Sequence, residues 1–198
     1  MWLYYIFLLS YFGIGWTNIQ KNRFLNSRDI IKIWKNIRKT IIINLGIIAP
    51  LFFYCIDNRI DYGSINYTNI LTHFLIFMLN WIFYEITTYF VHRLLHHSKF
   101  YFLHKKTHSI GNRIGISLYN NFPVDFLFLQ MLPLYLGLIM MKGHIFIYLY
   151  FTVLETYYRM GRINRDVGIF HRRNMNGNFG IDLFMDKLLK TSFKRKIQ

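Results

Sequence analysis

Long runs of uncharged, mostly apolar residues are the feature that most limits what this chain can fold into. Four or five runs come near the ~20 residues that a helix needs to cross a bilayer. They are Met1–Gln20, Thr40–Ile56, Tyr62–Val91 with Glu85 as its one charged residue, Phe126–Met141 and His144–Leu154. Only Lys142 and Gly143 separate the last two, which predicts a tight helical hairpin. Met1–Gln20 lacks a basic start and a small-residue cleavage site, so we expect a first membrane segment rather than a signal peptide.

The charges between these runs are mostly basic and unevenly distributed. The chain has 24 Lys and Arg against 9 Asp and Glu, a formal net charge of +15. Segments 17–39, 92–121 and 159–198 are strongly basic, whereas 57–61 is near neutral and 142–143 carries a single Lys. This alternation follows the positive-inside rule for a multi-pass membrane protein with its N-terminus outside and its C-terminus in the cytoplasm. Topology therefore explains the basic charge better than nucleic-acid binding does, and no nucleic-acid partner is expected.

Histidine is the only plentiful metal-ligand type, because Cys55 is the single cysteine. His92 and His96 end the third run, and His104 and His108 follow after a short predicted turn. Residues four apart on a helix lie within about 40° of each other, so each pair can direct both imidazoles at one metal ion. Two such pairs within 17 residues, on the side predicted to be cytoplasmic, indicate a metal site.

The remaining histidines and Glu85 carry separate expectations. His171 lies on the same predicted side and is a candidate fifth ligand. A carboxylate inside an apolar run needs a partner, so we expect Glu85 to accept the second ring N–H of a metal-bound histidine. His73 is predicted to pack or hydrogen-bond in mid-membrane, His144 to be a loop residue and His97 to be a surface histidine. The sequence thus predicts an all-α integral membrane protein with about four to five membrane helices and a histidine-rich cytoplasmic cap.

These motifs resemble the fatty acid hydroxylase and sterol desaturase superfamily, closest to its sterol methyl oxidase branch, over roughly residues 75–192. Residues 91–97, Val-His-Arg-Leu-Leu-His-His, are similar to the first of the family's three histidine clusters. Residues 103–109 are similar to the second, with Thr107 where the family has a histidine. The third cluster is degenerate, because it keeps His171 and lacks at least two family ligands. Further similar elements are residues 122–125, 154–156, 178–180 and 184–191.

The resemblance implies non-haem iron, of which the family holds two ions. The candidate ligands here favour one ion over two, and they are His92, His96, His104, His108 and His171. Possible oxygen ligands, or hydrogen-bond partners of the ligands, are Glu85, Asp125, Glu155 and Asn174. The implied organisation is a membrane and basic-loop region over 1–74, a fatty acid hydroxylase-like domain over 75–192 and a basic tail over 193–198.

The function implied by the resemblance is a membrane-bound oxidoreductase that uses O₂ to hydroxylate or desaturate a C–H bond of a sterol or fatty acyl chain. A lipid substrate, a membrane electron-transfer partner fed by a reduced pyridine nucleotide, and an endoplasmic reticulum-type membrane are implied with it. Two alternatives remain open. The missing histidines favour a catalytically inactive protein of the same fold that binds a lipid or a partner, and the second alternative is a metal-free basic membrane protein.

Overall fold

The computed structural model describes residues 27–63, 70–109, 120–163, 176–181 and 183–193. Every regular element within these residues is helical, which confirms the predicted all-α class. The elements are α2 (Ser27–Ile43), η1 (Asn44–Ile48), α3 (Ala49–Ile56), η2 (Asp57–Arg59), α4 (Ile70–Leu95), α5 (Tyr101–His108), α6 (Pro123–Asp125), η5 (Phe126–Met131), α7 (Leu132–Met141), α8 (Ile145–Ile163) and α10 (Phe184–Leu188).

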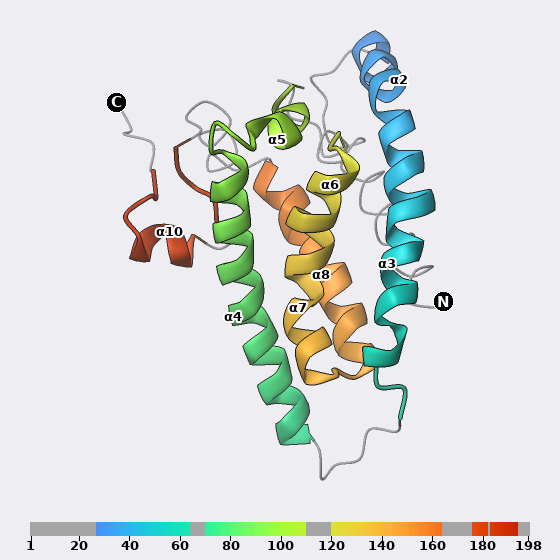
Figure 1. The fold of residues 1–198 in the computed structure, drawn as a ribbon, viewed down its shortest axis with the longest axis vertical. Helices are drawn as coiled ribbons and strands as arrows, with labels where there is room; N and C mark the ends of the chain where they lie inside the picture. The colour runs from blue at the N-terminus through green and yellow to red at the C-terminus, as the bar shows by residue number, and fades with distance from the viewer. Residues whose placement is uncertain (1–26, 64–69, 110–119, 164–175, 182, 194–198) are drawn as a thin grey trace.

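The long helices lie side by side and alternate in direction (Figure 1). α2, η1, α3 and η2 follow one another as one rod, and α4 runs in the opposite direction on the other side of the bundle. α6, η5 and α7 run between them in the first direction again, and α8 runs back a second time. α5 crosses over the end of α4, and α10 lies beside the same part of α4. We call this the α5 end, and we call the opposite end, where α7 turns into α8, the hairpin end.

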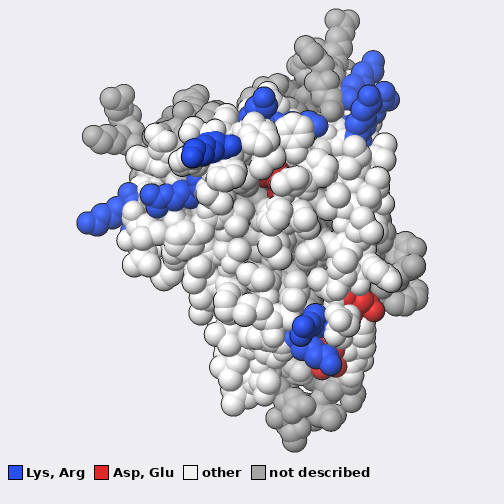
Figure 2. Space-filling view, viewed as in Figure 1, with Lys and Arg blue, Asp and Glu red and all other residues white. Residues whose placement is uncertain are grey.

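Three helical stretches are long and apolar enough to cross a membrane: Ile37–Arg59, Ile70–Leu95 and Pro123–Met141. A fourth, Ile145–Glu155, is apolar but shorter. Within the described residues three helices are therefore long and apolar enough to span a membrane, and the count of four to five stays a prediction. The predicted first segment, Met1–Gln20, lies outside the described residues. Figure 2 shows a broad band without charge between the two ends, as expected for a surface that faces lipid.

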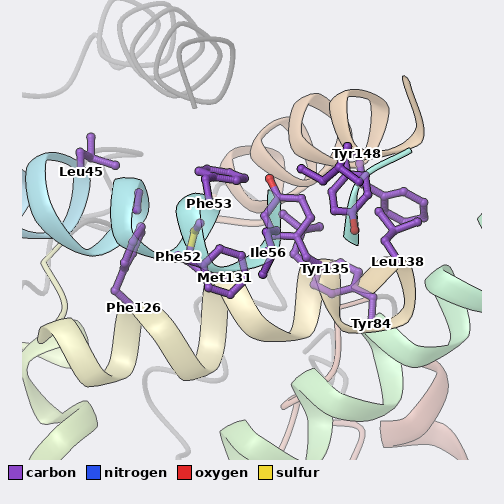
Figure 3. Packing of buried hydrophobic residues seen from close by; sticks show 14 of the residues in the cluster. Leu45, Phe52, Phe53, Ile56, Tyr84, Phe126, Met131, Tyr135, Leu138 and Tyr148 are labelled. Carbon is purple, nitrogen blue, oxygen red and sulfur yellow. The ribbon is translucent and has the colours of Figure 1, made fainter. Parts of the chain in front are cut away.

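Buried aromatic side chains fill the space between α3, α7 and α8 (Figure 3). The rings of Tyr135 and Tyr148 stack with centroids 5.6 Å apart. Phe52 and Phe53 pack against Tyr135 with centroids 5.8 and 5.5 Å away. The Tyr135 hydroxyl shares a hydrogen bond with Thr152, so its polar end is satisfied within the core. This core fixes the bundle on which the α5 end is built.

α4 and α7 approach each other very closely at Gly137. A Cβ added there would lie 2.6 Å from Oδ1 and 2.9 Å from Cα of Asn80. The fully buried Asn80 amide donates to the Leu134 carbonyl at 3.2 Å and accepts from the Leu138 N–H at 3.0 Å. A small residue lets two backbones come together, and the buried amide then finds its partners on the neighbouring helix. This contact anchors the helix that carries His92 and leads directly into His96.

Two π-helical turns interrupt the helices, and each ends two residues before a proline. η1 precedes Pro50 and η5 precedes Pro133. Proline cannot donate the helical hydrogen bond, so the preceding turn is free to widen. In η1 the Asn44 amide donates to the carbonyl and the side-chain oxygen of Asn121, at 3.1 and 3.0 Å. The first rod is thereby tied to the segment that leads into α6 and Asp125.

The hairpin end confirms the predicted tight turn, in which Lys142 adopts a left-handed conformation with φ 53°. His144 lies in the loop between α7 and α8, as predicted, and it is buried there: its Nε2 donates to the Gly63 carbonyl at 2.8 Å and its Nδ1 accepts from the Phe146 N–H at 3.2 Å. His73 lies in the first turn of α4, not in mid-membrane as predicted. Its ring centroid is 5.4 Å from that of His144. Both residues are therefore far from the α5 end.

Candidate metal centre

Four histidines converge at the α5 end. His92 comes from the last turn of α4, His96 directly follows the end of that helix with its N–H bonded to the His92 carbonyl, and His104 and His108 come from α5. One nitrogen of each ring lies within 4.8 Å of the corresponding nitrogens of the others. Neighbouring ring centroids are 4.8 to 5.0 Å apart. Both predicted pairs therefore share one helix face each and meet as one cluster, which we call the four-histidine centre.

A short turn places the second pair over the first. α4 ends at Leu95, the His97 N–H donates to the Leu94 carbonyl at 3.0 Å, and the Tyr101 N–H donates to the His97 carbonyl at 2.9 Å. The chain thus reverses within a few residues, and α5 begins directly beside the end of α4. His97 is exposed and lies outside the four-histidine centre, in line with a surface role.

His104 is held in the geometry of a metal ligand. It is 1% exposed, and its Nδ1 lies 3.0 Å from both carboxylate oxygens of Asp125. A carboxylate accepts, so Nδ1 carries the hydrogen and Nε2 keeps the lone pair. That Nε2 is buried without a hydrogen-bond partner among the described residues. A buried imidazole nitrogen of this kind, backed by a carboxylate, fits a bound metal ion.

Asp125 lies behind a ligand instead of on the metal side. Besides His104 it accepts a hydrogen bond from the Thr107 hydroxyl at 2.7 Å. Thr107 occupies the position at which the family resemblance calls for a histidine. In this chain it orients the carboxylate that orients His104. Asp125 is fully buried, so this hydrogen-bonded pair is shielded from solvent.

His92 is oriented by the backbone of a distant segment. Its Nδ1 donates to the Phe179 carbonyl at 2.9 Å, because a carbonyl can only accept. The lone pair then belongs to Nε2. The Phe179 ring also packs against the rings of His92 and His96, with centroids 5.6 and 5.4 Å away. Phe179 thus supplies the contact that we had expected from Glu85.

Glu85 holds the C-terminal segment in place. Its carboxylate is 4% exposed and accepts from the backbone N–H groups of Ile181 at 2.7 Å and Met185 at 3.4 Å. Asp186, also buried, accepts from the N–H groups of Phe179 at 2.9 Å and Gly180 at 2.6 Å. The two carboxylates therefore accept hydrogen bonds from four backbone N–H groups. These bonds stabilise the two buried carboxylates. We call residues 176–181 and 183–193, held in this way, the C-terminal clasp.

Phe179 and Asp186 had no predicted role, but the structure ties both residues to the four-histidine centre. Both lie in segments similar to family elements, so a signal was present, but nothing in it indicated that a carbonyl of residue 179 would face His92. Gly180 is required by the clasp, because a Cβ there would lie 3.1 Å from an Asp186 oxygen and closer still to Glu85.

The other predicted site residues have different positions. Glu155 is a buried residue of α8 that accepts from the Tyr84 hydroxyl at 3.2 Å, and it is not part of the four-histidine centre. His171 and Asn174 lie outside the described residues. The structure therefore brings together four of the five predicted ligands that were assigned from the sequence.

Basic residues surround this end of the molecule. Lys106 of α5 donates to the Thr40 hydroxyl at 2.7 Å, and its ammonium lies over the Phe122 ring, 5.1 Å from the centroid. Burial lowers the pKa of the Lys106 ammonium. These contacts attach α5, with His104 and His108, to the first rod. Figure 2 shows further Lys and Arg side chains at this end.

The described residues thus form an all-helical protein with apolar spans and a four-histidine centre at one end. Comparison with known proteins finds a local sequence similarity to a named enzyme. The chain is 40% identical over 73 residues to a fatty acid hydroxylase, ahd1, of Mycosarcoma maydis. The match covers 35% of this chain and 19% of that relative, so the chain spans about a fifth of its length. No family model and no solved structure matches the chain. The comparison supports the superfamily at most, and the sterol methyl oxidase branch stays a prediction.

Proposed function

We propose that this protein is a membrane-bound non-haem iron oxidoreductase that uses O₂ to oxidise a lipid C–H bond. The observation that carries the proposal is the four-histidine centre with the buried Nε2 of His104 and its carboxylate partner. The local similarity to a fatty acid hydroxylase supports both iron and a lipid substrate. The proposal covers both sterols and fatty acyl chains as substrates. It covers both hydroxylation and desaturation as reactions.

The donor set suits one ion. Imidazole nitrogens bind iron, zinc, copper and nickel, so the histidines alone do not select the metal. Four nitrogens within one 4.8 Å cluster can hold one ion and leave positions open for other ligands. His171, outside the described residues, is the proposed fifth ligand. Bound iron would supply the activation of O₂ that oxidation of an unactivated C–H bond requires, with electrons from a membrane redox partner.

The chain's own residues would fix the ligands and limit the access of water. Asp125 and the Phe179 carbonyl hold two imidazoles with Nε2 directed away from them, which fixes both tautomers. Phe90 and Leu94 lie on the outer side of α4, about 160–200° around the helix from His92, with 52% and 53% of their surfaces exposed. Tyr101 and Phe179 flank the histidine rings and restrict access of water.

Metal analysis of the detergent-purified protein tests the proposal. Wild-type protein should carry iron, at about one ion per chain if the one-ion prediction holds. Replacing any of the four histidines by Ala should lower bound iron and abolish lipid oxidation, because an open site loses its geometry with a ligand. His97→Ala is the matched control, since His97 adjoins the same helix end and lies outside the centre. It should leave iron content and activity unchanged.

The same experiment separates the alternatives. A wild-type protein without iron, whose four Ala variants behave like it, would replace the enzyme by the inactive lipid- or partner-binding protein of the same fold. Zinc bound at the same stoichiometry would confirm a metal site at the four histidines but refute the proposed oxidoreductase activity. Loss of iron on His171→Ala would show that the degenerate third cluster still contributes a ligand.

A further inference from the structure

Three basic side chains gather on α2 where the first apolar stretch begins. Lys35, Arg38 and Lys39 are all exposed, and that stretch starts at Ile37. No Asp or Glu occurs between residues 31 and 56. Among the described residues none of the three forms an ion pair, so their charge is uncompensated within this part of the chain. Figure 2 shows blue side chains along this edge of the molecule, over α2. We call these three residues the α2 basic cluster.

The same outer face of the rod becomes apolar within one turn. Arg38 and Ile42 are four residues apart, so they share a helix face and lie about 6 Å apart along the axis. Ile42 is 66% exposed, and Ile47 and Leu51 continue the strip with 53% and 57%. The opposite face, with Ile37 at 0%, is packed into the bundle. Cationic side chains thus sit directly above an apolar strip that no described residue covers.

Trp34 marks the level of this change along the helix. It is 44% exposed and directly precedes the cluster. Tryptophan with lysine and arginine is typical of the layer in which lipid headgroups meet the acyl chains, because these side chains combine an apolar body with a polar tip. A soluble anion would need only the charges. The continuous apolar strip adds a surface that only an amphiphile can use.

We propose that the α2 basic cluster binds an anionic phospholipid. Its phosphate lies against Lys35, Arg38 and Lys39, and an acyl chain follows Ile42 and Ile47 down the rod. Basic side chains at a membrane surface attract acidic lipids, by about fivefold in affinity for each charge. The site is separate from the four-histidine centre and does not depend on the proposed oxidation.

Spin-label resonance in proteoliposomes tests this proposal with the full chain. Purified protein is reconstituted in phosphatidylcholine vesicles with trace amounts of spin-labelled phosphatidylserine or phosphatidylcholine, and the motionally restricted fraction of each is measured. The test variant replaces all three cluster residues by glutamine. The control variant removes the same charge from other exposed positions at the α5 end and on α10: Lys99→Gln, Lys105→Gln and Lys187→Gln.

Wild-type and control proteins should prefer phosphatidylserine, and the test variant should lose at least tenfold of that preference. Its circular dichroism and metal content should match wild type, because the substituted side chains are exposed. An unchanged preference in the test variant, or an equal loss in both variants, would overturn the proposal. Displacement by soluble glycerophosphoserine at similar concentration would assign the cluster to a free headgroup. Binding of polyglutamate without any lipid preference would assign it to an acidic protein, and either result refutes the lipid site.

Discussion

Gly137→Ala would place a methyl group where the backbone of Asn80 lies. The new Cβ would be 2.9 Å from the Asn80 Cα, so α4 and α7 would have to separate. We expect the free energy of unfolding to fall by about 1–3 kcal/mol, as for an overfilled core. Thermal unfolding in detergent measures this.

Gly46→Ala is the matched control, because nothing lies within 4 Å of a Cβ at that position. This substitution should leave stability unchanged or raise it by up to about 1 kcal/mol, since alanine favours a helical backbone. Equal losses at both glycines would show that the α4–α7 contact is not a tight one.

Asp125→Ala removes the acceptor behind His104. The Nδ1 hydrogen and the Thr107 hydroxyl would lose their partner, and the imidazole could rotate. We expect metal affinity to fall about 10–100-fold, the usual effect of losing the group that orients a histidine ligand. Competition with a chelator of known affinity measures it. Asp57→Ala, an exposed carboxylate at the hairpin end, should have no effect on binding. Wild-type affinity in Asp125→Ala would mean that His104 is not a ligand.

Among the elements, the C-terminal clasp depends most on single side chains. Asp186→Ala would release the amides of Phe179 and Gly180 and the hydroxyl of Thr191. Hydrogen bonds to a buried charge contribute about 1.5–3 kcal/mol each. Hydrogen exchange in residues 176–181 and 183–193 should therefore become at least tenfold faster.

The same variant should bind metal more weakly, because the Phe179 carbonyl would no longer hold His92. Lys187→Ala changes an exposed residue of α10 and should alter neither exchange nor metal affinity. Faster hydrogen exchange with unchanged metal affinity would show that the C-terminal clasp does not support metal binding at the four-histidine centre.

The helix pairs show what local sequence can predict. The spacing of His92 with His96 and of His104 with His108 fixes each pair on one face, and the Lys142–Gly143 turn fixes the hairpin. These are contacts within a few residues, so helical geometry determines them. Glu85 was different, because its partners lie about 100 residues further along the chain. Its need for a partner followed from its apolar surroundings, but the identity of that partner depends on how the chain folds back.

For the whole molecule, the distribution of charge predicts orientation across the membrane. The α5 end should face the cytoplasm and the hairpin end the opposite side, and the charge count predicts the cytoplasmic side for segments 17–39, 92–121 and 159–198. Glycosylation acceptors introduced near Asn58 and Lys142 should be modified in microsomes. Acceptors near Arg113 and Lys194 should stay unmodified. Modification of an acceptor near Arg113 would show that the topology is the reverse of the predicted one and that the four-histidine centre faces the other compartment.

The dependence of His92 on Phe179 also bears on the order of events during synthesis. The two residues are 87 positions apart. At about 5–20 residues per second, the ribosome makes Phe179 roughly 4 to 17 seconds after His92. All four histidines exist for most of that interval, but one imidazole still lacks the acceptor that sets its tautomer. A metal ion bound this early would meet histidines of which one is not yet oriented. We therefore expect correct metallation only after the C-terminal clasp has been translated and has docked.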